Sequence, residues 1–333
     1  MGLEMTNFYT GKRVFVTGGA GFIGSHLVEM LVAQGARVTI PIRESTRLDY
    51  LDSVRDRIQI VEADLYDSVQ IERAMRGQEI IINLAAAMAY GVEYSRKHHA
   101  SLFRDNMRMV INVLEAARLQ RVERVLIVSS ACVYPRNASV PTPEEEGMKE
   151  SPEPTNGGYG WSKRMGEYLA QEYVKEYGMK IAIARPFNAY GPRNDFFREN
   201  QHVIPSLLKK ILEGQNPLEV WGNGQQTRSF LYVTDFARGL LEVCESYAVG
   251  DPLNIGSDEE VTVAQLAQLL IELTGAHTSI QFDVSRPEGQ PRRTCDTQKA
   301  YEKIGFKAQV PLREGLKRTI TWYQQTTALL PKA

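Results

Sequence analysis

The sequence predicts an α/β protein built on a doubly wound parallel sheet of the Rossmann type, with a smaller C-terminal lobe. Three observations support this fold class. Short β-branched runs alternate with segments of helical periodicity, a glycine-rich loop follows the first run, and the alternation stops near residue 186. Repeated strand–helix units of this kind form a parallel sheet with helices on both faces.

Six runs rich in Val and Ile predict the buried strands of the sheet. They lie at residues 14–16, 38–40, 58–61, 80–82, 125–128 and 181–184. Parallel strands are buried on both faces and therefore form near-continuous apolar runs. Between the first two runs, Ile23, Leu27, Met30 and Leu31 form one apolar stripe at helical spacing, and Gly35 is expected to end that helix.

The C-terminal half predicts a second lobe made of separated segments. Helices are expected at 203–212, 261–273 and 312–323, with a turn at 221–224. The run at 253–256 is expected to return to the sheet as one more strand. The predicted domains are 1–185 with a return segment at about 229–258, and the smaller lobe of 186–228 and 259–333.

Composition and charge exclude several classes of protein. The chain has 333 residues, 43% of them hydrophobic, and 39 basic against 40 acidic side chains give a net charge of -1. Such a balance predicts no attraction to nucleic acid or to an anionic membrane. No apolar run reaches the roughly 18 residues that span a bilayer, and the N-terminus lacks signal-peptide features, so a cytoplasmic protein is expected. The three cysteines are far apart, which argues against disulfides and against a bound metal.

The loop after the first strand carries three glycines at positions suited to a dinucleotide. Gly18, Gly21 and Gly24 stand between a predicted strand and a predicted helix, where a pyrophosphate meets backbone N–H groups at a helix N-terminus. Gly18 allows the tight turn, Gly21 lets the phosphates approach, and Gly24 lets the helix pack closely. Phe22 and Ile23, which open the helix, are counted with this cofactor site.

The end of the second strand predicts which dinucleotide is bound. An NAD enzyme usually places a carboxylate there for the ribose hydroxyls, whereas this chain has Ile42 and Arg43. A guanidinium suits the 2′-phosphate of NADP, so NADP(H) is favoured over NAD(H). After the third strand, Asp64 and Leu65 are candidates for contact with the adenine.

Tyr159 and Lys163 are four residues apart, which places them on one face of a helix. A free phenol has a pKa of about 10, and a fixed cation beside it favours the phenolate. Ser130 ends the fifth strand at the carboxyl edge of the sheet, where such sheets bind their ligands. The three residues together predict a redox centre that moves a proton.

These motifs resemble the extended short-chain dehydrogenase/reductase superfamily of nucleotide-sugar epimerases, dehydratases and reductases. The resemblance runs from Arg13 to about Tyr323 and includes Asn106 as the family's helix asparagine. It implies that the nicotinamide exchanges a hydride with a sugar carbon, that Tyr159 moves the proton on its oxygen, that Ser130 orients that oxygen, and that Lys163 holds the ribose. It also implies a homodimer, a nucleoside diphosphate sugar as substrate, and phosphate-binding segments at 185–192 and 228–235.

Two further residues resemble the acid–base pair of the GDP-L-fucose synthase family, which epimerises GDP-4-keto-6-deoxymannose at C3 and C5 and then reduces C4. Cys132 lies two positions after Ser130, and His202 stands in a His-Val-Ile-Pro segment. In that family these positions carry the base and the acid for epimerisation. The same resemblance places four residues of the smaller lobe on the substrate: Asn188, Lys210, Arg228 and Arg286.

Other interpretations of the sequence remain open. Segments 129–132 and 221–228 are also similar to GDP-mannose 3,5-epimerase, which cycles NAD without net reduction, although that enzyme has a lysine at the His202 position. In a simple 4-epimerase or 4-reductase of another nucleotide sugar, Cys132 and His202 would be incidental. A non-catalytic nucleotide-binding module is the last alternative, and it has no need of Ser130, Tyr159 and Lys163 together.

Overall fold

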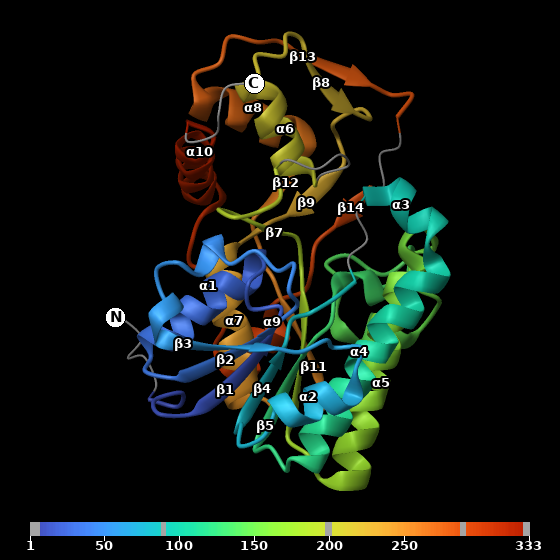
Figure 1. Cartoon of the computed structure of the whole chain (residues 1–333). Coiled ribbons are helices and arrows are strands. Elements are labelled where there is room, and N and C mark those ends of the chain that lie inside the picture. The colour runs from blue at the N-terminus through green and yellow to red at the C-terminus, as the bar shows by residue number, and fades with distance from the viewer. Residues whose placement is uncertain (1–6, 88–90, 197–201, 287–290, 329–333) are drawn as a thin grey trace.

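The computed structural model describes residues 7–87, 91–196, 202–286 and 291–328 (Figure 1). Its strands are β1 (Arg13–Thr17), β2 (Arg37–Ile42), β3 (Ile58–Glu62), β4 (Ile80–Asn83), β5 (Arg124–Val128), β6 (Ile181–Pro186), β7 (Ala189–Tyr190), β8 (Leu218–Trp221), β9 (Thr227–Ser229), β10 (Leu231–Tyr232), β11 (Pro252–Ile255), β12 (Glu260–Thr262), β13 (Ile280–Asp283) and β14 (Arg292–Arg293). Its α-helices are α1 (Phe22–Ala33), α2 (Ser68–Ala74), α3 (Gly91–Lys97), α4 (His99–Leu119), α5 (Gly157–Tyr177), α6 (Val203–Leu212), α7 (Val233–Ser246), α8 (Val263–Thr274), α9 (Gln298–Ile304) and α10 (Leu312–Ala328).

Seven parallel strands form the central sheet in the order β11-β6-β5-β4-β1-β2-β3. All six strands predicted from apolar runs are confirmed, and the predicted return strand is β11 at the edge of the sheet. The chain runs outward from β1 to β3 and then crosses back to β4 on the other side of β1. The strand order therefore reverses between β1 and β4, which is where doubly wound sheets bind their ligands.

Helices cover both faces of this sheet (Figure 1). Alternate residues of each strand face opposite sides, so Val14 and Val16 join the cluster under α1 and α7, while Phe15 joins the cluster under α2, α4 and α5. All three side chains are fully buried. Gly35, with a φ of +79°, follows the end of α1, as its position predicts.

The smaller lobe has an apolar core of its own, formed by α6, α8, α10 and strands β8 and β13. The predicted helix at 203–212 is confirmed as α6, and the helix at 312–323 is confirmed as α10, which continues to Ala328. The helix predicted from residue 261 begins at Val263 instead, because Glu260–Thr262 pairs with β9 as strand β12 and Thr262 caps the helix. None of the helices in the described ranges is long and apolar enough to cross a membrane.

Candidate active site

The glycine-rich turn between β1 and α1 has the shape of a cradle for an anion. Gly18 has a φ of +67°, a conformation that glycine adopts at little cost. A Cβ atom at Gly24 would lie 2.1 Å from the Gly18 carbonyl oxygen, and one at Gly21 would lie 3.3 Å from it. No side chain in the described ranges caps α1, so the N–H groups of its first turn can receive a phosphate. Phe22 and Ile23 form that first turn, and the arrangement fits a dinucleotide pyrophosphate.

Two polar side chains join β1 and β4 beside this turn. The Thr17 hydroxyl donates to Asn83 Oδ1 at 2.7 Å and accepts from the Ala85 N–H at 3.1 Å. Both side chains are buried. They hold the two strands together at the point where the strand order reverses, and sequence analysis did not identify them.

The candidate adenosine residues lie after β2 and β3. Arg43 is exposed, and its backbone N–H donates to Thr46 Oγ1 at 3.0 Å. Among the described residues, none forms an ion pair with its guanidinium. Asp64 accepts a hydrogen bond from the Tyr66 N–H at 3.0 Å, and the Leu65 carbonyl accepts one from Asn112 at 2.9 Å. The Asp64 carboxylate and the Leu65 carbonyl therefore help to fix the loop that follows β3.

Tyr159 and Lys163 lie one turn apart near the start of α5, beside the end of β5. Lys163 Nζ donates to the Val128 carbonyl at 2.8 Å and lies 5.4 Å from the centre of the Tyr159 ring. Burial raises the pKa of Tyr159, an effect that the nearby Cys132 strengthens and a hydrogen bond with Ser130 opposes. The expectation that a neighbouring cation makes the phenol more acidic is therefore not met here: desolvation dominates, and the group that opposes it is Ser130 rather than Lys163. Burial also lowers the pKa of Lys163 to about 8.

Two glycines bring the start of α5 close to the residues around it. A Cβ atom at Gly158 would lie 2.2 Å from the His99 carbonyl oxygen of α4, and one at Gly160 would lie 2.5 Å from the Cys132 carbonyl oxygen. Any larger residue would push α5 away from both neighbours. Tyr159 lies between these glycines, and the close packing holds its ring against the Ser130–Cys132 turn.

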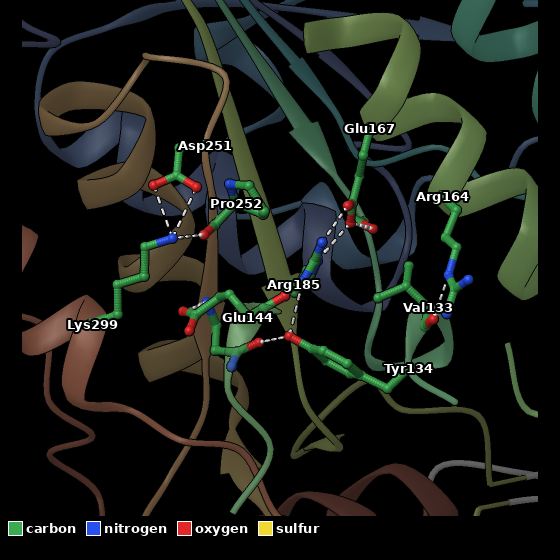
Figure 2. A network of polar contacts seen from close by, with 11 residues as sticks. Val133, Tyr134, Glu144, Arg164, Glu167, Arg185, Asp251, Pro252 and Lys299 are labelled. Carbon is green, nitrogen blue, oxygen red and sulfur yellow. Dashed lines mark hydrogen bonds and ion pairs between the residues drawn. The ribbon is translucent and has the colours of Figure 1, made fainter. Parts of the chain in front are cut away.

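A buried network supports the other side of that turn (Figure 2). Arg185 donates to both carboxylate oxygens of Glu167 at 2.9 and 2.7 Å, to the Tyr134 hydroxyl at 3.1 Å, and to the Glu144 carbonyl at 2.6 Å. Glu167 also accepts from the Ser129 hydroxyl. The Arg185 side chain is only 2% exposed. The expectation that segment 185–192 contacts phosphate is therefore wrong for this guanidinium, which points into the core to neutralise Glu167.

Cys132, His202 and Arg228 gather around Arg293. Arg293 Nη2 lies 3.7 Å from Cys132 Sγ, and Arg293 pairs with Arg228 in register across β14 and β9. His202, directly before α6, has its pKa lowered by burial and by Arg293. The same two causes lower the pKa of Arg228 to about 10. The structure thus brings Cys132 and His202 to one place through Arg293. The predicted site residues do not include Arg293, although its segment, 287–293, resembles one that the family places near the nucleotide.

The remaining candidate substrate residues are divided between two places. Lys210 donates to the Glu219 carbonyl at 3.0 Å, and Arg286 lies 5.3 Å from the Trp221 ring centre. Both therefore lie along β8, with Trp221 Nε1 donating to the Glu219 carboxylate at 2.9 Å. Asn188 instead donates to the Ser229 carbonyl at 2.8 Å, which ties the end of β6 to β9.

Asn106 is buried in α4, where it exchanges hydrogen bonds of 3.0 Å with both backbone groups of Ala87. It therefore shapes the loop after β4, close to the reversal point of the sheet. No group of three potential metal ligands occurs within the described part of the chain. All three cysteines are free thiols.

The doubly wound sheet, the glycine cradle and the Ser130, Tyr159 and Lys163 group together define a dinucleotide-dependent oxidoreductase fold and site. Residues 14–256 match the family model described as the NAD dependent epimerase/dehydratase family. The chain belongs to this family and is an NAD(P)-dependent enzyme.

Relatives with assigned activities cover almost the whole chain. A dTDP-4-dehydro-6-deoxy-D-allose reductase from a Streptomyces species is 34% identical over 95% of this chain and 97% of its own length. A probable GDP-L-fucose synthase 1 from Oryza sativa subsp. japonica is 34% identical over 94% of this chain and 92% of its own length. Among solved structures, the UDP-glucose 4-epimerase of Thermotoga maritima, with UDP-glucose, has a TM-score of 0.85 and 30% identity over 95% of this chain and 99% of its own.

Proposed function

We propose that the chain is an NADPH-dependent nucleotide-sugar epimerase and 4-reductase that acts on GDP-4-keto-6-deoxymannose. The observation that carries the proposal is the contact of Arg293 with Cys132, since the charge of Arg293 also lowers the pKa of His202. A thiol and an imidazole within reach of one substrate can act on opposite faces of a carbon. The GDP-L-fucose synthase among the relatives supports the choice of sugar.

The proposed proton chemistry uses the C4 ketone to acidify the hydrogens at C3 and C5. Cys132 removes such a proton, and the resulting enolate oxygen receives hydrogen bonds from Ser130 and Tyr159. His202 returns a proton from the other face, which inverts the carbon. Its lowered pKa makes its protonated form a stronger acid. The bound NADPH would supply the hydride that reduces C4, and Tyr159 then gives its proton to the C4 oxygen.

The same proposal assigns the cofactor and the substrate to different parts of the chain. Residues 1–185 and about 229–258 would hold the dinucleotide, and residues 186–228 and 259–333 the nucleotide sugar. The core formed by α6, α8 and α10 supports a separate smaller lobe, whereas Ala300 and Phe306 are buried in the core of the large sheet, so the stretch around α9 packs with the dinucleotide part. Within the smaller lobe, Arg228 would face the substrate diphosphate, since its charge has no carboxylate partner among the described residues.

NADP(H) is proposed over NAD(H) because Arg43, whose guanidinium forms no ion pair within the described ranges, follows β2 where a carboxylate would bind the ribose. Arg43→Ala is expected to weaken NADPH binding about tenfold and to leave NADH binding nearly unchanged, as measured by fluorescence titration. The exposed Arg47, which is paired with Asp49 at 2.6 Å, is the matched control. Equal affinities of the unmutated protein for the two cofactors would contradict the assignment.

A homodimer through α4 and α5 is also proposed. An open apolar hollow on these helices is lined by Phe103, Trp161 and Met165, and Phe103 and Trp161 are 38% and 39% exposed. Burying this surface against a second copy would remove it from water. Trp161→Glu should give a monomer in sedimentation, and a monomeric wild-type protein would exclude the dimer.

Deuterium exchange separates the proposed epimerisation from reduction. Cys132→Ser and His202→Gln should stop exchange of the C3 and C5 hydrogens with deuterated water, while NADPH still reduces the unepimerised ketone. Cys244→Ser, which changes a buried thiol far along the chain, is the control and should leave exchange intact. Exchange at the wild-type rate in both site variants would contradict the acid–base roles.

A plain 4-reductase is the second candidate, because one of the relatives is a dTDP-4-dehydro-6-deoxy-D-allose reductase. That enzyme would consume NADPH with its keto sugar and incorporate no deuterium at C3 or C5. Inversion without any consumption of NADPH would instead indicate a redox-neutral epimerase.

A further inference from the structure

Arg292 and Arg293 form a two-residue strand whose side chains have different partners. β14 runs parallel to β9, with Arg292 opposite Thr227 and Arg293 opposite Arg228. Successive residues of a strand point to opposite faces. Arg292 forms a bidentate pair with Glu260, both distances being 2.7 Å. Arg293 turns the other way, toward Cys132.

The surroundings of Cys132 are strongly cationic. Arg293 Nη2 lies 3.7 Å from its sulfur, and Arg228 lies beside Arg293 across the strand pair. Within the described ranges, no carboxylate forms an ion pair with either guanidinium. From α5, Lys163 also interacts electrostatically with Cys132. Positive charge of this kind stabilises a thiolate over a thiol.

We propose that Arg293 is the counter-ion of the Cys132 sulfur and so supports Cys132 as the base of the epimerisation. The inference rests on the proposed function, and it adds a residue that acts through Cys132. In the step concerned, a C–H bond of the sugar breaks and an S–H bond forms, while the electron pair moves to the C4 oxygen. The N–H proton of His202 then forms the new C–H bond on the opposite face, and exchange with solvent restores both residues.

Alkylation of Cys132 by iodoacetamide tests the inference without any sugar. Cys244 and Cys295 are buried, whereas Cys132 is partly exposed, so its modification can be followed by peptide mass spectrometry with Cys132→Ser as the blank. Arg293→Gln should slow alkylation about threefold, because the variant removes the cation beside the reacting sulfur. Arg293→Lys should restore most of the rate.

Arg292→Gln is the matched control, since it removes a neighbouring guanidinium from the same strand and should leave the rate unchanged. Thermal unfolding of each variant reports whether it is folded. Equal alkylation rates in the wild type and a folded Arg293→Gln variant would overturn the inference, and so would an equal loss in both glutamine variants.

A measurement on the unmutated protein covers the case in which Arg293→Gln does not fold. The measured quantity is the ratio of the alkylation rate with anionic iodoacetate to the rate with neutral iodoacetamide. This ratio should be higher for Cys132 than for glutathione, and added salt should bring the two ratios closer together. A ratio equal to that of glutathione would also overturn the inference. Failure of the deuterium experiment with an intact alkylation effect would reject the sugar chemistry and keep the role of Arg293.

Discussion

Glu167→Gln tests whether the Arg185–Glu167 pair is essential to the fold around the site. The side chains of the two residues are 2% and 3% exposed, so the variant leaves the Arg185 charge buried without its counter-ion. Removal of one partner from a buried pair costs about 3–5 kcal/mol. At about 2 °C per kcal/mol for a large chain, the unfolding midpoint should fall by about 6–10 °C.

Chemical denaturation followed by fluorescence would measure the free energy of unfolding, and calorimetry would measure the midpoint temperature. Glu272→Gln is the control: Arg313 and Glu272 also form an ion pair at 2.6 Å, but the two side chains are 50% and 58% exposed, so the expected loss is about 1 kcal/mol or less. The double variant Glu167→Leu with Arg185→Met should recover part of the loss, because it leaves no unpaired charge. A loss below about 1 kcal/mol in Glu167→Gln would refute this reasoning.

Three further predictions concern the site. Tyr159→Phe should keep cofactor binding and lose turnover about a hundredfold or more in an NADPH absorbance assay; near-normal turnover would exclude its acid role. Gly24→Ala should weaken NADPH binding at least tenfold in a fluorescence titration, because a Cβ atom at Gly24 would lie 2.1 Å from the Gly18 carbonyl oxygen. Gly166→Ala is the control, since a Cβ atom at Gly166 would lie 3.7 Å from its nearest neighbour. Equal NADPH affinities of Gly24→Ala and the wild type would contradict the role of the glycine turn. Burial lowers the pKa of Lys163 from 10.5 to about 8. Between these pH values the unfolded chain keeps the Lys163 proton and the folded protein does not, so the free energy of unfolding should rise with pH. Lys163→Met should remove that rise in urea titrations at several pH values, and an unchanged profile would count against the shift.

Local patterns in the sequence were sufficient to predict the sheet and much of the smaller lobe. Apolar β-branched runs predicted six strands of the large sheet because parallel strands are buried on both faces. The helix beginning at Val203 was predicted with both of its ends. The start of α8 was missed by two residues because Val261 pairs with Arg228 of β9, and strand pairing between distant segments leaves no local signal.

Charged residues in the interior were the hardest to predict. Arg185 lies in β6, and a resemblance implied that its segment, 185–192, binds phosphate, whereas its partner Glu167 lies 18 residues earlier on α5. Charged side chains are expected at the surface unless a partner is known, and a single sequence does not specify that partner. The contact of the partly buried Arg293 with Cys132 was not predicted either, since it joins residues 161 positions apart.

The three-stranded sheet of the smaller lobe limits how its specificity could be exchanged between relatives. Its strands β9, β12 and β14 come from three stretches of chain, and between the first two the chain returns to the large sheet as β11. A chimaera with a single crossover between residues 229 and 260 would therefore join Arg228 from one parent to Arg293 from the other. Under the proposed division of the chain, transfer of substrate preference requires three crossovers, which exchange 186–228 and 259–333 together and leave the intervening segment with β11 in place.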